Sequence, residues 1–412
     1  MKLVTPFHFW LVVSGVVYLG ARFGRAYLSF LLLALIFLAP TQIGTPKLFK
    51  GDPLDKIMYV LTMFFCTMAA ISFFANMHMG LFVLCTVLYF AAYVGAPSRK
   101  HPNAVDQCRK DRVNGKNFMV TGCTSGIGVE TVRALYLSGA NRVFMVARNP
   151  KKLKATIDQI VRSSTAMHGE EKLVPLVCDL NDLGSVKACA NDFQSKFVDT
   201  KAIVGLHCLI TNAGVMALAE RRDSAQGFER QVGINHIGHY LLARLVQPAL
   251  ARVPGSRLVA LSSSAHRMCD IKFLDHDRLE TVPYDPWVAY GNSKYANILF
   301  AKAWNKRFGG PDGTCAFAVM PGGIFTGLQD EVPKAILFKW LVVAPFFFKT
   351  VSQGAATSLH CATIASIDDS GSYFNDCKVG AGSGRFHKKS EDVDLNARRL
   401  WEKTEKLVSK WL

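Results

Sequence analysis

The segment Asn117–Gly128 is the most informative part of the chain for its fold, and it reads Asn-Phe-Met-Val-Thr-Gly-Cys-Thr-Ser-Gly-Ile-Gly. An apolar, β-prone run comes first, and a helix-like segment follows the last glycine as far as Gly139. Glycines between a strand and a helix let the backbone approach a pyrophosphate, which the helix N-terminus then faces. We therefore predict a dinucleotide-binding turn. In it Gly122 permits the tight turn, Gly126 lets the backbone approach the phosphates, and Gly128 allows helix and strand to pack closely.

Short β-prone runs alternate with helical stretches from Val113 onward. Strands that alternate with helices predict a parallel sheet covered on both faces. The predicted fold class is therefore α/β, a Rossmann-type doubly wound parallel sheet that forms the catalytic domain over residues 113–412. Its expected strands are Phe118–Thr121, Arg142–Val146, Val174–Cys178, Cys208–Thr211, Arg257–Ser262 and Cys315–Met320.

The first 98 residues have a different composition and are mostly apolar. Two of their runs, Ile57–Ala75 and Met77–Ala96, approach the ~20 residues that a spanning helix requires. With two further runs, Phe7–Leu19 and Tyr27–Ile43, they predict an α-helical membrane region of two to four transmembrane helices over residues 1–98. A cleaved signal peptide is the alternative, but it would have a single short apolar core.

A basic linker, residues 99–112, follows the last apolar run. Positive charge next to a membrane segment predicts a cytosolic position for the domain that follows. The formal net charge of the chain is +17, yet the basic residues form no long tract and no zinc-finger spacing is present. We therefore expect no nucleic-acid partner, and a surface that meets anionic lipid or a phosphorylated cofactor explains the charge better.

The 11 cysteines are scattered singly, without a CxxC pair or a histidine cluster of metal-ligand spacing. This pattern predicts a reducing compartment and no metal site.

Arg148 follows the second predicted strand, at the place where NAD-binding sites commonly carry a carboxylate. A guanidinium there suits a 2′-phosphate, so Arg148 predicts NADP(H) as the cofactor. The alternative is an ordinary solvated loop arginine.

The spacing TGxxxGxG over Thr121–Gly128 resembles that of the short-chain dehydrogenase/reductase family. Three further motifs resemble the family in order along the chain, namely Asp179-Leu180 at the adenine, Asn212–Gly214 beside the nicotinamide ribose and Pro321–Thr326 over the nicotinamide. Together with Arg148, the resemblance implies cofactor contacts from Gly122, Thr124, Ser125, Gly126, Ile127, Gly128, Asp179, Leu180, Asn212, Ala213, Gly214, Tyr290, Lys294, Pro321, Gly322 and Thr326.

Tyr290 and Lys294 are four residues apart and therefore share one face of a helix. An ammonium close to a phenol favours the phenolate, so we expect the pKa of Tyr290 to be pushed down toward the working pH, as a general acid/base requires. The resemblance places Ser263, in the run Ser262–Ser264 after the fifth strand, where it would hydrogen-bond the substrate oxygen. The resemblance adds Asn235 as a fourth catalytic residue that supports a water path for proton exchange. Taken singly, each side chain could instead be an ordinary core or surface residue.

The long insert between Ser263 and Tyr290 resembles the subgroup of retinol dehydrogenases, WW-domain oxidoreductases and polyprenol dehydrogenases. So do Gly371–Phe374 and Arg398–Trp401. The resemblance implies a lipophilic alcohol and its aldehyde or ketone, such as a retinoid or polyprenoid, as substrate. It also implies the endoplasmic reticulum as the location, with other organelle membranes left open. An apolar stretch, Leu328–Lys349, could line a lipophilic pocket or touch the bilayer.

Two other functions remain open at this point. The fold could serve as a catalytically weak membrane scaffold or signalling protein, or the enzyme could be a membrane ketosteroid or lipid ketone reductase. A transporter is disfavoured, because the apolar segments show no charged or broken helices typical of a midplane site. The expected partners are a lipophilic small molecule and membrane lipid, and a homodimer stays open.

Overall fold

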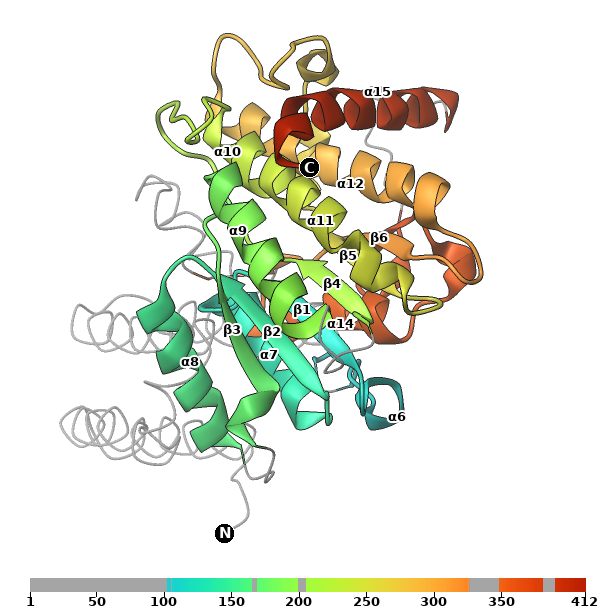
Figure 1. Ribbon diagram of the computed structural model, residues 1–412. Helices are drawn as coiled ribbons and strands as arrows, with labels where there is room; N and C mark the ends of the chain where they lie inside the picture. Colours follow the sequence, from blue (N-terminus) through green and yellow to red (C-terminus); the bar gives the residue numbers. More distant parts are fainter. Residues whose placement is uncertain are drawn as a thin grey trace, which may run out of the picture. The chain divides into compact units, whose positions relative to one another are not determined.

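The computed structural model describes residues 102–104, 106–164, 169–198, 205–324, 326, 348–380 and 390–412 (Figure 1). The predicted membrane region and most of the apolar stretch after Thr326 lie outside the described residues. Within the described ranges, no helix is both long and apolar enough to cross a membrane.

An eight-stranded sheet in the order β10-β9-β6-β5-β4-β1-β2-β3 forms the centre of the described part. All neighbouring strands run parallel except β9 and β10, so the predicted Rossmann-type sheet is confirmed. The order reverses between β1 and β4, and ligands bind at such a switch point in doubly wound sheets. The strands are β1 Asn117–Thr121, β2 Arg142–Ala147, β3 Leu173–Val177, β4 Cys208–Thr211, β5 Arg257–Leu261, β6 Cys315–Met320, β9 Tyr373–Asn375 and β10 Lys378–Val379.

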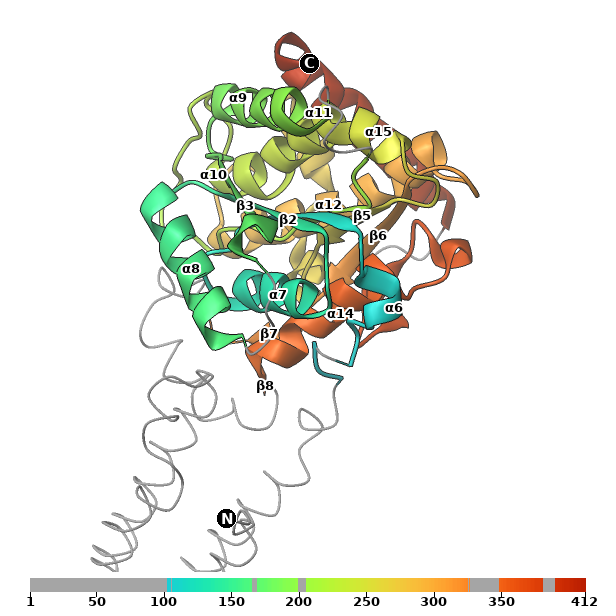
Figure 2. The same ribbon diagram turned by 60° about the horizontal axis from the view of Figure 1, so that its bottom comes forward.

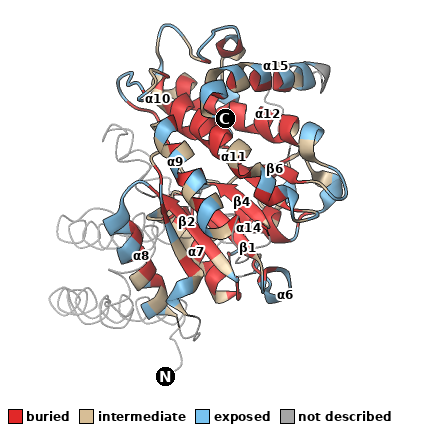
Figure 3. Cartoon of the chain, in the orientation of Figure 1, coloured by how far each residue is buried: buried red, intermediate tan, exposed pale blue. Residues whose placement is uncertain are grey.

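Helices cover both faces of this sheet (Figure 2). One layer contains α7 Gly126–Leu137, α8 Pro150–Ser163 and α14 Val351–Thr363, and the other contains α9 Leu183–Phe193, α11 His239–Ala251 and α12 Pro286–Phe308. Side chains of β1 alternate between the two layers, because Phe118 and Val120 belong to one apolar core and Met119 to the other. The central strand β1 is buried along its whole length as a result (Figure 3).

Three smaller features complete the described part. The C-terminal helix α15 Ser390–Val408 packs on α12, where Trp401 is buried beside Phe300 and Trp304. Two short strands, β7 Gly323–Ile324 and β8 Phe348–Lys349, pair in parallel. The remaining short helices include α6 Lys110–Val113, α10 Arg230–Val232 and a π-helical turn, η4 Gly233–Gly238.

Candidate active site

The glycine turn has the geometry that the sequence predicts. Gly122 has a φ of +66°, and a Cβ built on it would lie 2.6 Å from the Cα of Ala213. A Cβ on Gly128 would lie only 2.2 Å from the carbonyl oxygen of Gly122. Only glycine fits either position, because β1, α7 and the turn after β4 approach each other so closely.

The N-terminus of α7 can receive an anion. Its N-cap residue Ser125 makes no side-chain hydrogen bond to the helix, and the first turn contains no acidic residue. The first backbone N–H groups of a helix need partners, and a pyrophosphate supplies them. Thr326 lies beside this end of the helix, since a Cβ on Gly126 would lie 2.8 Å from its Cγ2. Thr124 precedes Ser125 and Ile127 follows Gly126, and both of these residues are partly buried. These residues fit the phosphates of a dinucleotide.

The turn after β4 is hydrogen-bonded to the turn after β1. The side-chain nitrogen of Asn212 donates to the carbonyl oxygens of Thr121, at 2.9 Å, and Gly122, at 3.2 Å. The amide of Ala213 donates to the hydroxyl of Thr121 at 2.9 Å. A Cβ on Gly214 would lie 3.5 Å from the Nζ of Lys294, so this turn reaches the candidate catalytic lysine.

The predicted adenine and ribose-phosphate residues follow the carboxyl ends of neighbouring strands. Arg148 comes directly after β2 and is exposed. Asp179 follows β3, and its carboxylate accepts from the amide of Asn181 at 3.0 Å, while Leu180 is buried. The exposed guanidinium of Arg148 makes no ion pair with any described residue. It can therefore bind a phosphate.

Tyr290 and Lys294 lie in the first turns of α12 and are both buried. The helix begins there because Asp285 accepts hydrogen bonds from the amides of Trp287 and Val288, both at 2.8 Å, and Pro286 occupies the first position. The Nζ of Lys294 lies 5.6 Å from the ring centre of Tyr290 and donates to the carbonyl of Leu261 at 3.2 Å.

The structure distinguishes among the three serines that follow β5. The hydroxyl of Ser262 is buried and donates to the carbonyl oxygen of Lys294 at 2.8 Å, which is a structural contact. Ser264 is exposed. Ser263 is partly buried, its hydroxyl accepts from the amide of Ala265 at 3.2 Å, and it lies close enough to Tyr290 to lower the pKa of the phenol.

The predicted lowering of the tyrosine pKa is wrong for this structure. Burial raises the pKa of Tyr290 to about 12, against a smaller lowering by the hydrogen bond with Ser263. Burial also lowers the pKa of Lys294 to about 8. The physical reason is that both groups lose water together and that the ammonium lies over the ring rather than at the hydroxyl. Tyr290 is therefore protonated and able to donate.

Asn235 occupies the π-helical turn η4, a feature frequent at functional sites. Its side chain donates to the carbonyl of Val215 and the hydroxyl of Ser293, both at 2.9 Å, and accepts from the Val215 amide at 2.9 Å. Its backbone carbonyl accepts from Asn297 and from His239, both at 3.1 Å. This dense bonding fixes the turn against the start of α12.

Two groups near the site escaped the sequence reasoning. Met216, Ala217 and Ala265 form a small apolar cluster with Tyr290, and Trp287 packs against it. Lys349 of β8 is buried, pairs with Asp376 and lies against Gly322, the glycine that follows Pro321 after β6. Residues distant in sequence build both features. Only the apolar character of the stretch around Lys349 gave any indication of them.

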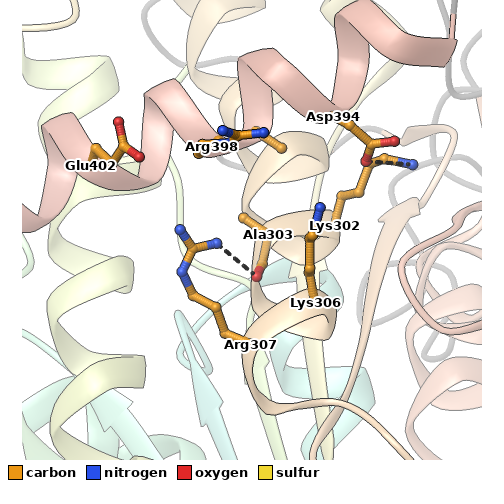
Figure 4. Close-up of a pocket in the computed structure, with 8 residues that line it drawn as sticks. Lys302, Ala303, Lys306, Arg307, Asp394, Arg398 and Glu402 are labelled. Carbon is orange, nitrogen blue, oxygen red and sulfur yellow. Dashed lines mark hydrogen bonds and ion pairs between the residues drawn. The ribbon is translucent and has the colours of Figure 1, made fainter.

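A separate cavity of about 400 Å³ lies between α12 and α15 (Figure 4). Its lining is mostly charged and of both signs, and Lys302 pairs there with Asp394 at 3.3 Å. None of the candidate site residues lines it, so it is not the substrate site. Within the described ranges, no three or more His, Cys, Asp and Glu side chains are grouped so as to hold a metal ion.

The fold and the site together define an oxidoreductase of the Rossmann type. A family model described as "short chain dehydrogenase" matches residues 116–275. Mouse retinol dehydrogenase 12 is 37% identical over 321 residues, which covers 77% of this chain and 95% of that protein. Human retinol dehydrogenase 11 is 34% identical over 324 residues, which covers 78% of this chain and 94% of that protein. A crystal structure of an uncharacterised protein from Mycobacterium paratuberculosis aligns with a TM-score of 0.53 at 28% identity, covering 73% of this chain and 97% of that one.

The chain belongs to the short-chain dehydrogenase/reductase family and is similar to retinol dehydrogenases. It is therefore an oxidoreductase that acts on CH–OH groups of a small molecule, and its fold implies a nicotinamide cofactor.

Proposed function

We propose that the chain is a membrane-bound, NADP(H)-dependent oxidoreductase that interconverts a lipophilic alcohol and its aldehyde or ketone. The observation that carries the proposal is the convergence of Ser263, Tyr290 and Lys294 beside Gly214, with an apolar cluster against the tyrosine. Apolar side chains at the reacting centre favour a substrate of low polarity. Retinol, the alcohol named in the names of both relatives, is a substrate of this kind.

This geometry supports the following roles for the site residues. Tyr290 gives its proton to the substrate oxygen during reduction and takes it back during oxidation, while Ser263 hydrogen-bonds the same oxygen. When bound, the nicotinamide would donate hydride during reduction and accept it during oxidation. Lys294 lies close enough to Gly214 to hold the ribose there, and Asn235 keeps the turn at Val215 in place.

Arg148 supports the choice of NADP(H) over NAD(H). It is exposed and follows the second strand, where a guanidinium can bind a 2′-phosphate through two parallel hydrogen bonds. An acidic residue, which would repel that phosphate, is absent at this place in the sequence.

The membrane part of the proposal rests on the sequence. We propose that residues 1–98 form two to four transmembrane helices, residues 99–112 a basic linker, and residues 113–412 a catalytic domain on the cytosolic side of the endoplasmic reticulum. Four apolar runs and the linker charge support this arrangement. Membrane lipid is then a partner, and it brings a lipophilic substrate close to the site.

The test uses the full chain in liposomes with retinal and NADPH, and Tyr290→Phe as the control. We expect retinol formation that depends on NADPH and is lost in the control. Failure to reduce retinal, a polyprenal or any other lipophilic carbonyl compound, although NADPH binds, would overturn the proposal in favour of a scaffold.

A further inference from the structure

The candidate catalytic asparagine and the cofactor turn come from different parts of the chain. Ala213 follows β4, whereas Asn235 lies in the π-helical turn before α11. The side chain of Asn235 is held by Val215 and Ser293, as described above. Its backbone carbonyl accepts a hydrogen bond from His239, the first residue of α11.

A continuous chain of hydrogen bonds links the two parts through this histidine. The amide of Ala213 donates to the Oγ1 of Thr121 at 2.9 Å, which lies 2.8 Å from the Nε2 of His239. The Nδ1 of His239 lies 3.1 Å from the carbonyl oxygen of Asn235. Thr121, Asn235 and His239 are at most 1% exposed, so water does not compete for these bonds.

The two ends and a neutral imidazole ring together fix the direction of every bond in the chain. An amide N–H can only donate and a carbonyl can only accept. The hydroxyl of Thr121 therefore accepts from Ala213 and donates to Nε2, and Nδ1 carries the proton that His239 donates to Asn235. Burial lowers the pKa of His239 to about 3, so the ring stays neutral and keeps this tautomer near neutral pH.

We propose that His239 is a positioning residue that couples the cofactor turn at Ala213 to the backbone of the catalytic Asn235. This inference rests on the proposed function, from which both of those residues take their roles. An apolar side chain of similar size would fill the space, but it would leave the Thr121 hydroxyl and the Asn235 carbonyl without this partner. His239 is thus needed for alignment of the site beyond its contribution to packing.

Substitutions at Thr121 break the chain with little change in shape. Thr121→Val removes the hydroxyl, and Thr121→Ser restores it. The matched control is Thr363→Val on α14, because Thr363 is also buried and its hydroxyl donates to the backbone carbonyls of Gln107 and Leu359. We expect Thr121→Val to lower kcat about tenfold, the equivalent of one hydrogen bond in the transition state, with substrate KM little changed. Thr121→Ser should recover most of kcat, and Thr363→Val should lower only the melting temperature.

A double-mutant cycle separates alignment from general loosening of the fold. Because Thr121→Val and His239→Leu break the same chain, the double variant should lose no more kcat than the worse single variant. Losses that multiply, or a Thr121→Val variant with wild-type kcat, would overturn the inference. Turnover that is lost in Tyr290→Phe but kept in Thr121→Val would refute the positioning role alone, whereas turnover that persists in both variants would refute the proposed function and the positioning role with it.

Discussion

Replacement of Gly122 by alanine should weaken NADPH binding far more than a comparable glycine substitution elsewhere. Gly122 has a φ of +66°, a conformation that costs an L-residue roughly 1–2 kcal/mol. The new Cβ would also lie 2.6 Å from the Cα of Ala213, a backbone atom that cannot rotate away, so the two turns must separate. If about 1.4 kcal/mol of this strain weakens the free energy of NADPH binding, the Kd for NADPH rises about tenfold.

Gly115 provides the matched control for this prediction. Its φ is +75°, but a Cβ there would have nothing within 4 Å. Gly115→Ala therefore shares the backbone cost without the collision at Ala213. The assay is titration of each variant with NADPH, followed by tryptophan fluorescence, with thermal unfolding measured in parallel. Equal Kd values for Gly122→Ala and Gly115→Ala would refute the reasoning.

Four further predictions follow from the site and the sequence. Arg148→Asp should shift preference toward NAD(H) in initial-rate assays, and a wild type that already uses both cofactors equally would contradict the role of Arg148. Tyr290→Phe should lower kcat by about 10²–10⁴-fold, the usual contribution of a general acid/base, while NADPH binding measured by fluorescence persists. Burial lowers the pKa of His236 to about 4 and of His239 to about 3, so unfolding takes up protons below pH 6.5. Stability should therefore fall as pH drops from 6.5 toward 4, by up to roughly 2.7 kcal/mol per pH unit for both rings, and denaturant melts of His236→Gln should show a shallower fall. Protease added to sealed microsomes should digest the domain after Val113, whereas full protection until detergent is added would place that domain in the lumen.

The sequence predicted the central sheet well, because its six main strands are continuous apolar runs between helical stretches. Each predicted strand agrees with the observed one to within one residue at either end. The short strands β7–β10 were missed, since two or three residues carry no periodicity. The π-helical turn around Asn235 was also invisible, because sequence patterns do not distinguish it from an ordinary helix start.

Most of the motifs that the sequence singled out follow the carboxyl ends of strands, and the structure brings Tyr290, Lys294 and Gly214 close together. The sequence did not predict the pKa of Tyr290 correctly. The spacing of Tyr290 and Lys294 predicted a lowered tyrosine pKa, but that spacing says nothing of burial, and burial dominates for both groups. The contact of Thr121 with His239 joins residues 118 positions apart and could not be read from either segment.

The most direct test of the proposed function compares kcat/KM along a chain-length series of aldehydes in liposomes, with retinal and a short polyprenal included. Burial of hydrocarbon is favourable by about 0.8 kcal/mol per CH₂, so long substrates concentrate in the lipid where the enzyme is anchored. The apolar cluster beside Tyr290 would favour the same compounds. We predict that kcat/KM rises with chain length and is highest for the isoprenoid aldehydes. Faster turnover of small, water-soluble aldehydes would contradict the account.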